Sequence, residues 1–340
     1  EEQALTGEAP VYLNGVYECV PIDYHEKAVG FAEASDVRPP APNALGLDIW
    51  IDGEAFSFHS GTVQTYKRSL DFQHGLLTRD ILWTSPKGHK VQISFERLTS
   101  LYRPNIAALR LRITPIENAC HIKLCSHLNW INTKDEDSSI SELHDPRIGP
   151  SFKETPWEGF EKIDQEDAKG FALSTKKSGV GVVSLISHSV AGAQRETRFD
   201  QNLEEIFETH IDPRKPFEFT KFIAYAATSE ADNDPPKERA LIAIQDAKAA
   251  GFDTLCNEQR EFLSQFWHGA ETSIEGDQRL DTALKFCTFH ILQGCGRDDA
   301  TSIGAKGQTG EGYEGHYFWD AEIFSLPRLL YSAPDMARAM

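Results

Sequence analysis

The apolar residues of this chain repeat with two different periods, and the change falls near residue 228. Before it they follow the two-residue alternation of half-buried strands: Leu47, Ile49 and Ile51 alternate, and Asp52-Gly53 is a typical hairpin turn. Further runs of this character cover residues 91–98, 108–116, 121–130, 180–190 and 217–228. Because no helical pattern separates these runs, they predict antiparallel sheets stacked as a large sandwich.

After Thr228 the pattern becomes helical. Pro235-Pro236 suits the first turn of a helix, where the missing N–H would be unpaired in any case. This helix is expected to run to Gly251, where glycine can adopt a left-handed C-terminal cap. A second helix is predicted over residues 255–267.

Two more helices follow. The third ends near residues 294–296, and four apolar residues spaced i, i+4, i+7 and i+11 predict its buried face: Leu280, Leu284, Cys287 and Ile291. The fourth begins around Phe318 and carries Trp319, Ile323 and Leu326 before Pro327.

These patterns divide the chain into a β-sandwich domain (1–228), a helical linker (229–270) and the start of an α-helical domain (271–340). The last part has room for only two or three helices of ordinary length, too few to close a helical core. We therefore expect the chain to be a fragment whose remaining helices lie in further sequence.

Charge and cysteine content limit the partners. The 340 residues hold 34 Lys and Arg against 52 Asp and Glu, a formal charge of −18, so binding to nucleic acid or anionic lipid is not expected. No run approaches the ~18 apolar residues of a membrane span. Six scattered cysteines without C-x-x-C pairs, and an N-terminus without a secretory signal, favour a soluble cytoplasmic protein with free thiols.

Residues 120–127 include four potential metal ligands, but their spacing does not favour a metal site. Cys120, His121, Cys125 and His127 are residue types that bind zinc. In a strand, however, His121, Cys125 and His127 would lie on one face and Cys120 on the other, which does not favour a closed tetrahedral site. No metal is predicted, and the acidic run 133–139 is read as a solvated loop.

The glycine-rich stretch 304–320 has the spacing of a dinucleotide fingerprint but the wrong context. Gly310, Gly312 and Gly315 satisfy G-x-G-x-x-G, yet the stretch follows a helix in a chain without parallel-sheet rhythm. A P-loop fails because Gly310 is followed by Glu311 and Gly312 instead of Lys and Ser or Thr. A nucleotide site is therefore not expected.

Since a nucleotide site is not expected, the stretch 304–320 is interpreted as a long loop rich in aromatic residues and carboxylates. Such a composition suits a sugar, because its C–H faces stack on aromatic rings and its vicinal hydroxyls donate to a fixed carboxylate. The structural alternative is that Phe318, Trp319 and Phe324 anchor a core while Asp320 caps a helix. The composition alone leaves both readings open.

Two long segments, in the right order, resemble glycoside hydrolase family 65, the inverting α-glucoside phosphorylases typified by maltose, kojibiose, nigerose and trehalose phosphorylases. They are VYLNGVYECVPIDYHEKAVGF (11–31) and residues 273–327, which include GYEGHYFWD. The resemblance implies an N-terminal super-β-sandwich, a helical linker and an (α/α)6 barrel, here incomplete. Ala321 stands where many members have Thr, and the chain begins some tens of residues inside the usual N-terminus.

The resemblance also implies the chemistry. A Glu would protonate the departing glycosidic oxygen while inorganic phosphate attacks the anomeric carbon, releasing β-glucose 1-phosphate and a free acceptor. This general acid is expected beyond Met340, so no catalytic residue is assigned within the chain. No cofactor is expected besides phosphate as co-substrate, and a homodimer is implied.

Within the chain the resemblance assigns one wall of the glucose subsite. Trp319 and Asp320 match the family's "F-W-D" positions, with Asp320 on the sugar hydroxyls and Trp319 on its face or edge; Tyr313 and His316 are second choices. Phe318 and Phe324 are expected in the core. Glu322 is a rival carboxylate that should point elsewhere on the helix.

Two other functions remain possible from the sequence. One is an α-glucoside hydrolase of the same fold that uses water instead of phosphate. The other is a non-catalytic carbohydrate-binding sandwich whose helical tail serves contacts between subunits. Linkage and acceptor are expected to depend on barrel loops outside this chain.

Overall fold

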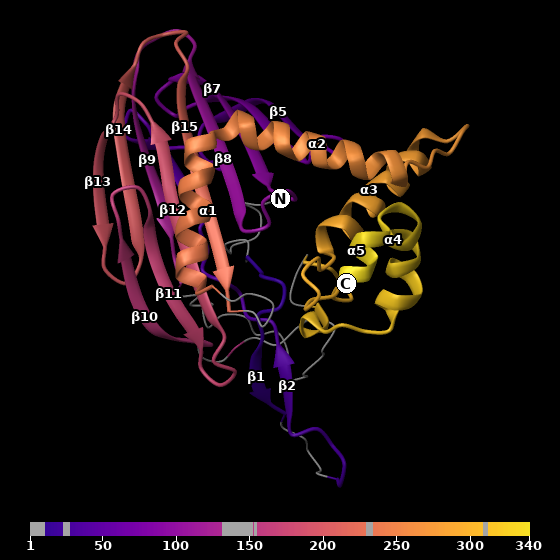
Figure 1. Cartoon of the computed structure of the whole chain (residues 1–340). Helices are drawn as coiled ribbons and strands as arrows, with labels where there is room; N and C mark the ends of the chain where they lie inside the picture. Colours follow the sequence, from indigo (N-terminus) through magenta and orange to yellow (C-terminus); the bar gives the residue numbers. More distant parts are fainter. Residues whose placement is uncertain (1–10, 23–27, 131–151, 153–154, 229–233, 309–311) are drawn as a thin grey trace.

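A β-sandwich and a group of helices beside it make up the computed structural model (Figure 1), which describes residues 11–22, 28–130, 152, 155–228, 234–308 and 312–340. Every strand pairing among these residues is antiparallel, as the sequence predicts. Within the described segments, none of the helices combines the length and apolar character that crossing a bilayer requires.

The larger sheet has eight strands, in the spatial order β10, β11, β12, β15, β8, β7, β6, β5. Their bounds, in that order, are Trp157–Asp164, Lys169–Thr175, Gly181–Val190, Phe217–Ala227, Ile106–Pro115, Lys90–Thr99, Leu76–Thr84 and Thr62–Asp71. The four runs that the sequence assigned to strands in this region coincide with β7, β8, β12 and β15. β5, β6, β10 and β11 carry a weaker alternation, and the sequence did not single them out.

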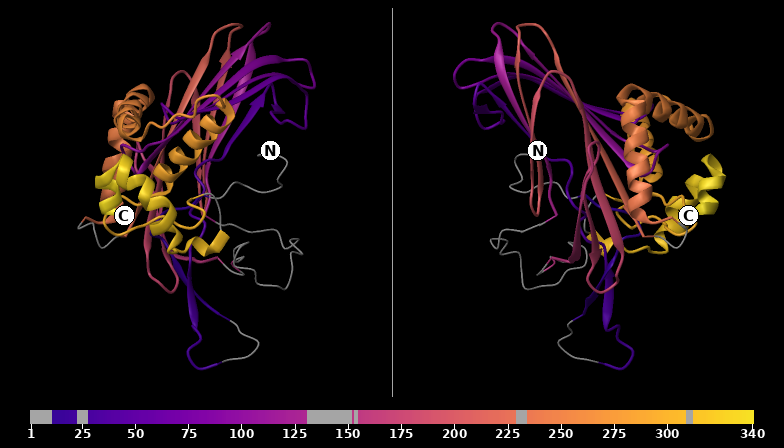
Figure 2. Two further views of the ribbon diagram at one scale, coloured as in Figure 1. Left: turned by 90° about the vertical axis from the view of Figure 1, so that its right-hand side faces the viewer. Right: turned by 60° about the vertical axis from the view of Figure 1, so that its left-hand side comes forward.

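The smaller sheet has five strands, in the order β13, β14, β9, β3, β4. They cover Gln194–Phe199, Leu203–Ile211, Cys120–Leu128, Leu47–Ile51 and Glu54–Ala55. The predicted turn between β3 and β4 is confirmed, because Asp52 and Gly53 both have positive φ (49° and 80°). A separate hairpin, β1 (Glu18–Pro21) with β2 (Ala34–Val37), projects from one end of the sandwich (Figures 1 and 2).

The two sheets enclose an apolar core that includes Ile51, Trp83, Leu111 and Phe219, all fully buried. Burial of such side chains is the main stabilising contribution to a sandwich. The helix α1 (Pro236–Ala250) covers the other face of the larger sheet, over β12 and β15. Strands β12 and β15 are therefore buried on both faces, and their buried residues are consecutive, from Val182 to His188 and from Phe219 to Ala224.

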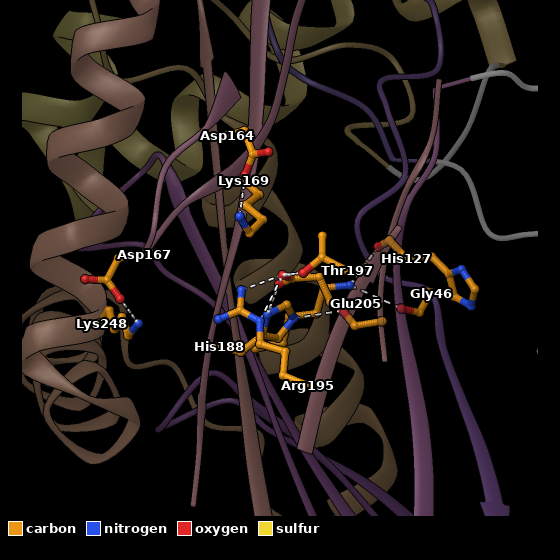
Figure 3. A network of polar contacts seen from close by, with 12 residues as sticks. Gly46, His127, Asp164, Asp167, Lys169, His188, Arg195, Thr197, Glu205 and Lys248 are labelled. Carbon is orange, nitrogen blue, oxygen red and sulfur yellow. Dashed lines mark hydrogen bonds and ion pairs between the residues drawn. The ribbon is translucent and has the colours of Figure 1, made fainter. Parts of the chain in front are cut away.

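A polar network crosses the sandwich core (Figure 3). The His188 ring lies between Ser126 Oγ (2.9 Å from Nε2) and the Glu205 carboxylate (2.7 Å from Nδ1). Arg195 and Thr197 also donate to Glu205, while the Lys221 ammonium donates to the backbone carbonyls of two neighbouring residues, Gly46 and His127. Burial lowers the pKa of His188 to about 4, so at neutral pH the ring is neutral beside an ionised Glu205.

Helices α1 and α2 (Phe252–Ala270) meet at Gly251. The sequence placed a cap at this glycine, and its N–H does bond to the carbonyl of Ala247. Its φ is 79°, but its ψ is 163°, so the residue is extended and not in the left-handed helical region that was expected. The extended conformation ends α1 and starts α2 at the same residue.

Helix α3 (Gln278–Gly294) begins at Asp277, whose carboxylate accepts the N–H groups of Arg279 and Leu280. Its end agrees with the sequence prediction, but the predicted buried face is wrong. Leu280 and Cys287 are exposed, whereas Phe289 and Leu292 are fully buried. The helix has apolar residues on two faces, and it turns the Phe289 side toward the β5–β6 end of the sandwich and α2.

The last helices differ from the single helix expected before Pro327. A π-helical turn, Ala321–Ser325, leads into α4 (Leu326–Ser332), and α5 (Pro334–Ala339) follows. Pro327 lies in the first turn of α4 and does not end a helix, because a proline in that position gives up no intrahelical bond. The π-helical turn lies directly before α4 and accommodates the change of hydrogen bonding at the start of that helix.

Candidate functional site

The glycine-rich loop that follows α3 contains a strained turn. Tyr313, Glu314 and Gly315 are consecutive residues with left-handed φ values of 58°, 57° and 78°. The left-handed region costs a non-glycine residue about 1–2 kcal/mol. Two such residues in a row persist only where their surroundings fix them, and such strain is typical of functional loops.

The N-terminal part of the chain holds this turn. The Arg38 N–H donates to the Glu314 carbonyl (2.9 Å), and the Ser35 hydroxyl donates to the Glu314 carboxylate (2.7 Å). The Tyr17 hydroxyl donates to the Gly315 carbonyl (2.7 Å). Glu314 is buried, so its charge and backbone are both fixed by these contacts.

Arg38 anchors the preceding part of the loop. Its side chain is 1% exposed, lies over the Tyr12 ring (5.2 Å) and donates to the Gly307 carbonyl (3.0 Å) and the Gln308 side-chain oxygen (2.9 Å). Burial lowers the pKa of the Arg38 guanidinium. A Cβ at Gly315 would lie 2.8 Å from the Cβ of Arg38, so this close approach requires glycine.

A third connection uses Asn14. Its amide donates to the Ser302 carbonyl (2.9 Å) and its side-chain oxygen accepts from the Tyr317 hydroxyl (2.9 Å). The Tyr17 and Tyr317 rings meet edge to face, 6.1 Å apart, and burial raises the pKa of Tyr17. We name Asn14, Tyr17, Ser35 and Arg38 the N-terminal clamp, because together they fix the loop at both sides of its strained turn.

The four residues expected to contact a sugar occupy two different environments. His316 turns toward the clamp, with Nε2 2.5 Å from the Asp36 carbonyl oxygen. Tyr313 is half-buried, 5.6 Å from the Phe318 ring, and the Lys306 ammonium lies 5.3 Å from its centroid. Trp319 is 73% exposed and Asp320 is also exposed. The structure therefore brings Tyr313 and His316 to Phe318, while Trp319 and Asp320 stand outside that cluster.

The expectation that Phe318 and Phe324 lie in the core is wrong in this structure. Their side chains are 37% and 72% exposed. The π turn and α4 bury Ala321 and Leu329 on one side, and no second layer of described residues covers their other side. The apolar residues there include Ile323 and Leu330, which are exposed as well.

Asp320 does not act as a helix cap among the described residues. It occupies the position before the π turn, but it has helical φ and ψ (−56° and −32°), and its side chain makes no capping bond there. An N-cap residue normally has extended φ and ψ and accepts an N–H from the first turn. The structural alternative for Asp320 is therefore not supported, and its carboxylate is accessible.

A cavity of about 680 Å³ lies elsewhere, between the β5–β6 turn and α2. It includes none of the four predicted sugar-binding residues. Its lining consists of Gln73, His74, Arg260, Ser264, Gln265, Trp267, His268 and Glu271. Trp319 and Asp320 are exposed and lie outside this cavity.

The sequence analysis missed Glu314 and the clamp residues. The segment 11–31 carried the family resemblance without a role for its side chains, and Ser35 and Arg38 lie just beyond it. The structure shows that this segment and the glycine-rich loop are in contact, although nearly the whole chain separates them in sequence. Both distant segments resemble the same family, and this shared resemblance was the indication in the sequence that they could be in contact.

Comparison with known proteins gives two family matches in the corresponding order. Residues 1–266 match the N-terminal domain of glycosyl hydrolase family 65, and residues 285–340 match the central catalytic domain of the same family. A solved structure, a putative kojibiose phosphorylase from the human microbiome, superimposes with a TM-score of 0.81 at 22% identity, over 96% of this chain and 42% of that one. This match supports the sandwich followed by an incomplete helical barrel.

Curated relatives agree with the family matches. The chain is 33% identical to the alpha,alpha-trehalose phosphorylase of Thermoanaerobacter brockii, over 97% of this chain and 42% of that protein. It is 27% identical to the kojibiose phosphorylase of Halothermothrix orenii, over 89% of this chain and 39% of that protein. The chain thus spans about two fifths of the length of these relatives. The chain belongs to glycosyl hydrolase family 65, of which it contains the N-terminal domain and the beginning of the central catalytic domain.

Proposed function

We propose that the protein to which this chain belongs catalyses the inverting phosphorolysis of an α-linked glucosyl disaccharide. The products would be β-glucose 1-phosphate and a free acceptor sugar. Family membership supports the reaction class, since relatives along nearly the whole chain are named trehalose and kojibiose phosphorylases. The observation that carries the site is the exposed Trp319-Asp320 pair at the end of a loop fixed by the N-terminal clamp.

In this proposal Asp320 accepts hydrogen bonds from vicinal hydroxyls of the glucosyl unit. A carboxylate can accept at both oxygens, and such charge-assisted bonds are roughly twice as strong as neutral ones. The indole of Trp319 packs against the C–H face or edge of the ring. The clamp contributes by holding the loop in one conformation, because small errors in substrate position cost large factors in rate.

The remaining catalytic groups would come from sequence beyond Met340. A Glu there would donate a proton to the glycosidic oxygen as the bond to the anomeric carbon breaks. Phosphate would attack from the opposite face and invert the configuration. Because phosphate is already anionic, the reaction needs no general base, in contrast to an inverting hydrolase, where a second carboxylate activates water.

The experiment is a substrate panel with the full-length protein. Trehalose, kojibiose, maltose and nigerose are each incubated with and without inorganic phosphate, and β-glucose 1-phosphate and free glucose are measured. The proposal predicts phosphate-dependent release of glucose 1-phosphate from at least one of them, with trehalose tested first because of the 33% identical relative. Release of glucose alone, independent of phosphate, would make the protein a hydrolase.

A third result would indicate a binding protein. If no disaccharide is turned over but one binds, the sandwich with its helices would serve as a carbohydrate-binding unit. Binding is measured by calorimetry with the same four sugars. Binding without turnover would contradict the proposed activity.

We also propose a homodimer in the cytoplasm. All six cysteines of the chain are free thiols, which fits a reducing compartment. Light scattering on the full-length protein tests the dimer. Cell fractionation with an antibody tests the location, and recovery from the periplasm would contradict it.

A further inference from the structure

The outer face of the smaller sheet brings together three side chains of the kinds that bind transition metals. Cys125 and His127 lie two residues apart on β9, so both point to the same face. Glu204 on β14 is paired directly with His127 in the sheet register. The backbone pairing of two adjacent strands therefore fixes the thiol, the imidazole and the carboxylate next to one another.

The donor atoms are near the spacing that one metal ion requires. Cys125 Sγ lies 4.0 Å from His127 Nδ1, and His127 Nδ1 lies 3.9 Å from Glu204 Oε1. With one ligand atom taken from each of the three residues, these atoms lie within 4.8 Å of one another. Zinc bonds of about 2.0–2.3 Å place tetrahedral ligands about 3.3–3.8 Å apart. Bringing the three ligand atoms to this spacing requires shifts of less than about 1 Å, which small rotations of the side chains can supply.

A fourth residue orients the ring. Asp48, on β3 at the other side of β9, lies with Oδ2 2.9 Å from His127 Nε2. Metal-binding histidines usually donate the other ring N–H to a carboxylate, which fixes the tautomer and the direction of the ligating nitrogen. Here that arrangement directs Nδ1 toward the thiol and the Glu204 carboxylate. Figure 3 shows the His127 ring turned away from Glu205 and His188, and its backbone carbonyl accepts from the Lys221 ammonium.

The site is partly buried, with one open side. Cys125 is 5% exposed, the His127 side chain 17% and the Glu204 side chain 39%. A buried thiol at the base and an exposed carboxylate at the rim leave room for a water molecule as the fourth ligand. Arg198, which faces Glu204 from β13, donates to Glu196 (2.8 Å).

The combination of thiolate, imidazole and carboxylate favours Zn²⁺ over the hard cations Mg²⁺ and Ca²⁺, which prefer oxygen ligands alone.

We propose that Cys125, His127 and Glu204 form a zinc-binding site on the outer face of the five-stranded sheet, with Asp48 as the residue that orients His127. The site ties β9 to β14. It uses none of the residues assigned to the sugar, so it is independent of the proposed phosphorolysis. Zinc bound there stabilises the folded protein, because the ligands converge only in the folded sheet.

The test starts from full-length protein freed of metal with a chelator. Zinc is titrated against a competing chromophoric chelator, and the bound metal is counted. We expect one Zn²⁺ per chain and an increase in melting temperature on addition of zinc. Cobalt in place of zinc should give the thiolate-to-metal charge-transfer absorption that reports a cysteine ligand.

Variants locate the site. Cys125→Ser should remove the charge-transfer band, and both His127→Ala and Glu204→Gln should weaken zinc binding at least tenfold. Asp48→Asn should weaken it about 10- to 100-fold. His121→Ala, a histidine on the same strand and the same face, is the matched control and should leave the affinity unchanged. Glu204→Gln is not expected to disturb folding, because the Glu204 side chain lies at the exposed rim of the site, so its effect on zinc binding separates ligand loss from misfolding.

Three results would overturn the proposal. They are the absence of stoichiometric zinc binding, zinc binding that survives both Cys125→Ser and Glu204→Gln, and loss of binding in His121→Ala alone. Disaccharide phosphorolysis is measured on the same metal-free protein. Because the sugar and zinc residues differ, failure of the zinc site leaves the proposed function untouched, and failure of phosphorolysis leaves the zinc site untouched.

Discussion

The hydroxyl of Tyr17 donates a 2.7 Å hydrogen bond to the backbone carbonyl of Gly315, which lies 298 positions later in the chain. Through this bond a residue of the β-rich half controls the backbone of the loop that presents Trp319 and Asp320. If the loop forms the glucose subsite, the rate of the enzyme's reaction depends on residues that never touch the sugar.

Tyr17→Phe tests this dependence. The variant keeps the ring but removes the donor, so the Gly315 carbonyl loses its partner and the left-handed turn is held less firmly. We expect kcat/KM of the full-length enzyme to fall about tenfold and the unfolding free energy to fall by only about 1 kcal/mol. Tyr102→Phe, at an exposed tyrosine, is the control. Equal kcat/KM for wild type and Tyr17→Phe would contradict a role of the clamp in positioning.

Gly315→Ala tests the close approach of the loop to Arg38. The new Cβ would lie 2.8 Å from the Arg38 Cβ, at a φ of 78° that alanine adopts poorly. We expect destabilisation of about 2–4 kcal/mol, measured by urea unfolding. Gly276→Ala is matched in φ (86°) but its Cβ would meet nothing within 4 Å, so it isolates the backbone cost of about 1 kcal/mol. Equal effects of the two substitutions would show that contact with Arg38 is unimportant.

Asp320→Ala tests the proposed sugar contact. Because the side chain is exposed and caps no helix among the described residues, the melting temperature should not change. We expect kcat/KM to fall more than 100-fold, about 2.7 kcal/mol, if the contact strengthens in the transition state. Glu322→Ala, the neighbouring exposed carboxylate, should stay within threefold of wild type. A loss below threefold for Asp320→Ala would dismiss the assignment.

The buried network predicts a pH-dependent stability. Burial lowers the pKa of His188 to about 4, and although burial opposes it, bonding to His188 and Arg195 lowers the pKa of Glu205 to about 2. Between pH 6.5 and 2 the unfolded chain therefore binds more protons than the folded one, so the unfolding free energy must fall as the pH falls. Urea unfolding at a series of pH values measures this decrease.

Glu205→Gln identifies the part of the effect that comes from this carboxylate. Loss of the charge beside Arg195 should destabilise the protein by about 2–4 kcal/mol at pH 7 and flatten the decrease between pH 4.5 and 2. Glu196→Gln, at an exposed position on β13, should change the stability by less than about 0.5 kcal/mol. An unchanged pH dependence in Glu205→Gln would mean that other carboxylates dominate acid unfolding.

Local patterns were sufficient for part of the strands and for the ends of α1 and α3. The two-residue period identified β7, β8, β12 and β15, and Asp52-Gly53 identified a turn that needs two positive φ values. These features depend on neighbours within a few residues. They are therefore visible in any sequence whose local preferences agree with its fold.

Features that depend on distant partners were not predictable. The buried face of α3 depends on which of its two apolar sides meets Phe72 and α2, and Phe289 faces that neighbour. The burial of Glu314 depends on Ser35, 279 positions away. Cys125 and His127 could be placed on one face from the sequence, but Glu204 joins them only through the pairing of β9 with β14.

Gly251 has a mechanical consequence for the whole molecule. Since α1 is fixed to the larger sheet and α2 starts at the same glycine where α1 ends, Gly251 sets the direction in which α2 leaves the sandwich. The Arg103–Glu258 ion pair holds α2 against the sandwich, and the Tyr17–Gly315 and Arg38–Glu314 bonds hold the later loop. Rotation at Gly251 would have to break contacts at both places, so any movement of the helices against the sandwich would also release the loop that carries Trp319 and Asp320.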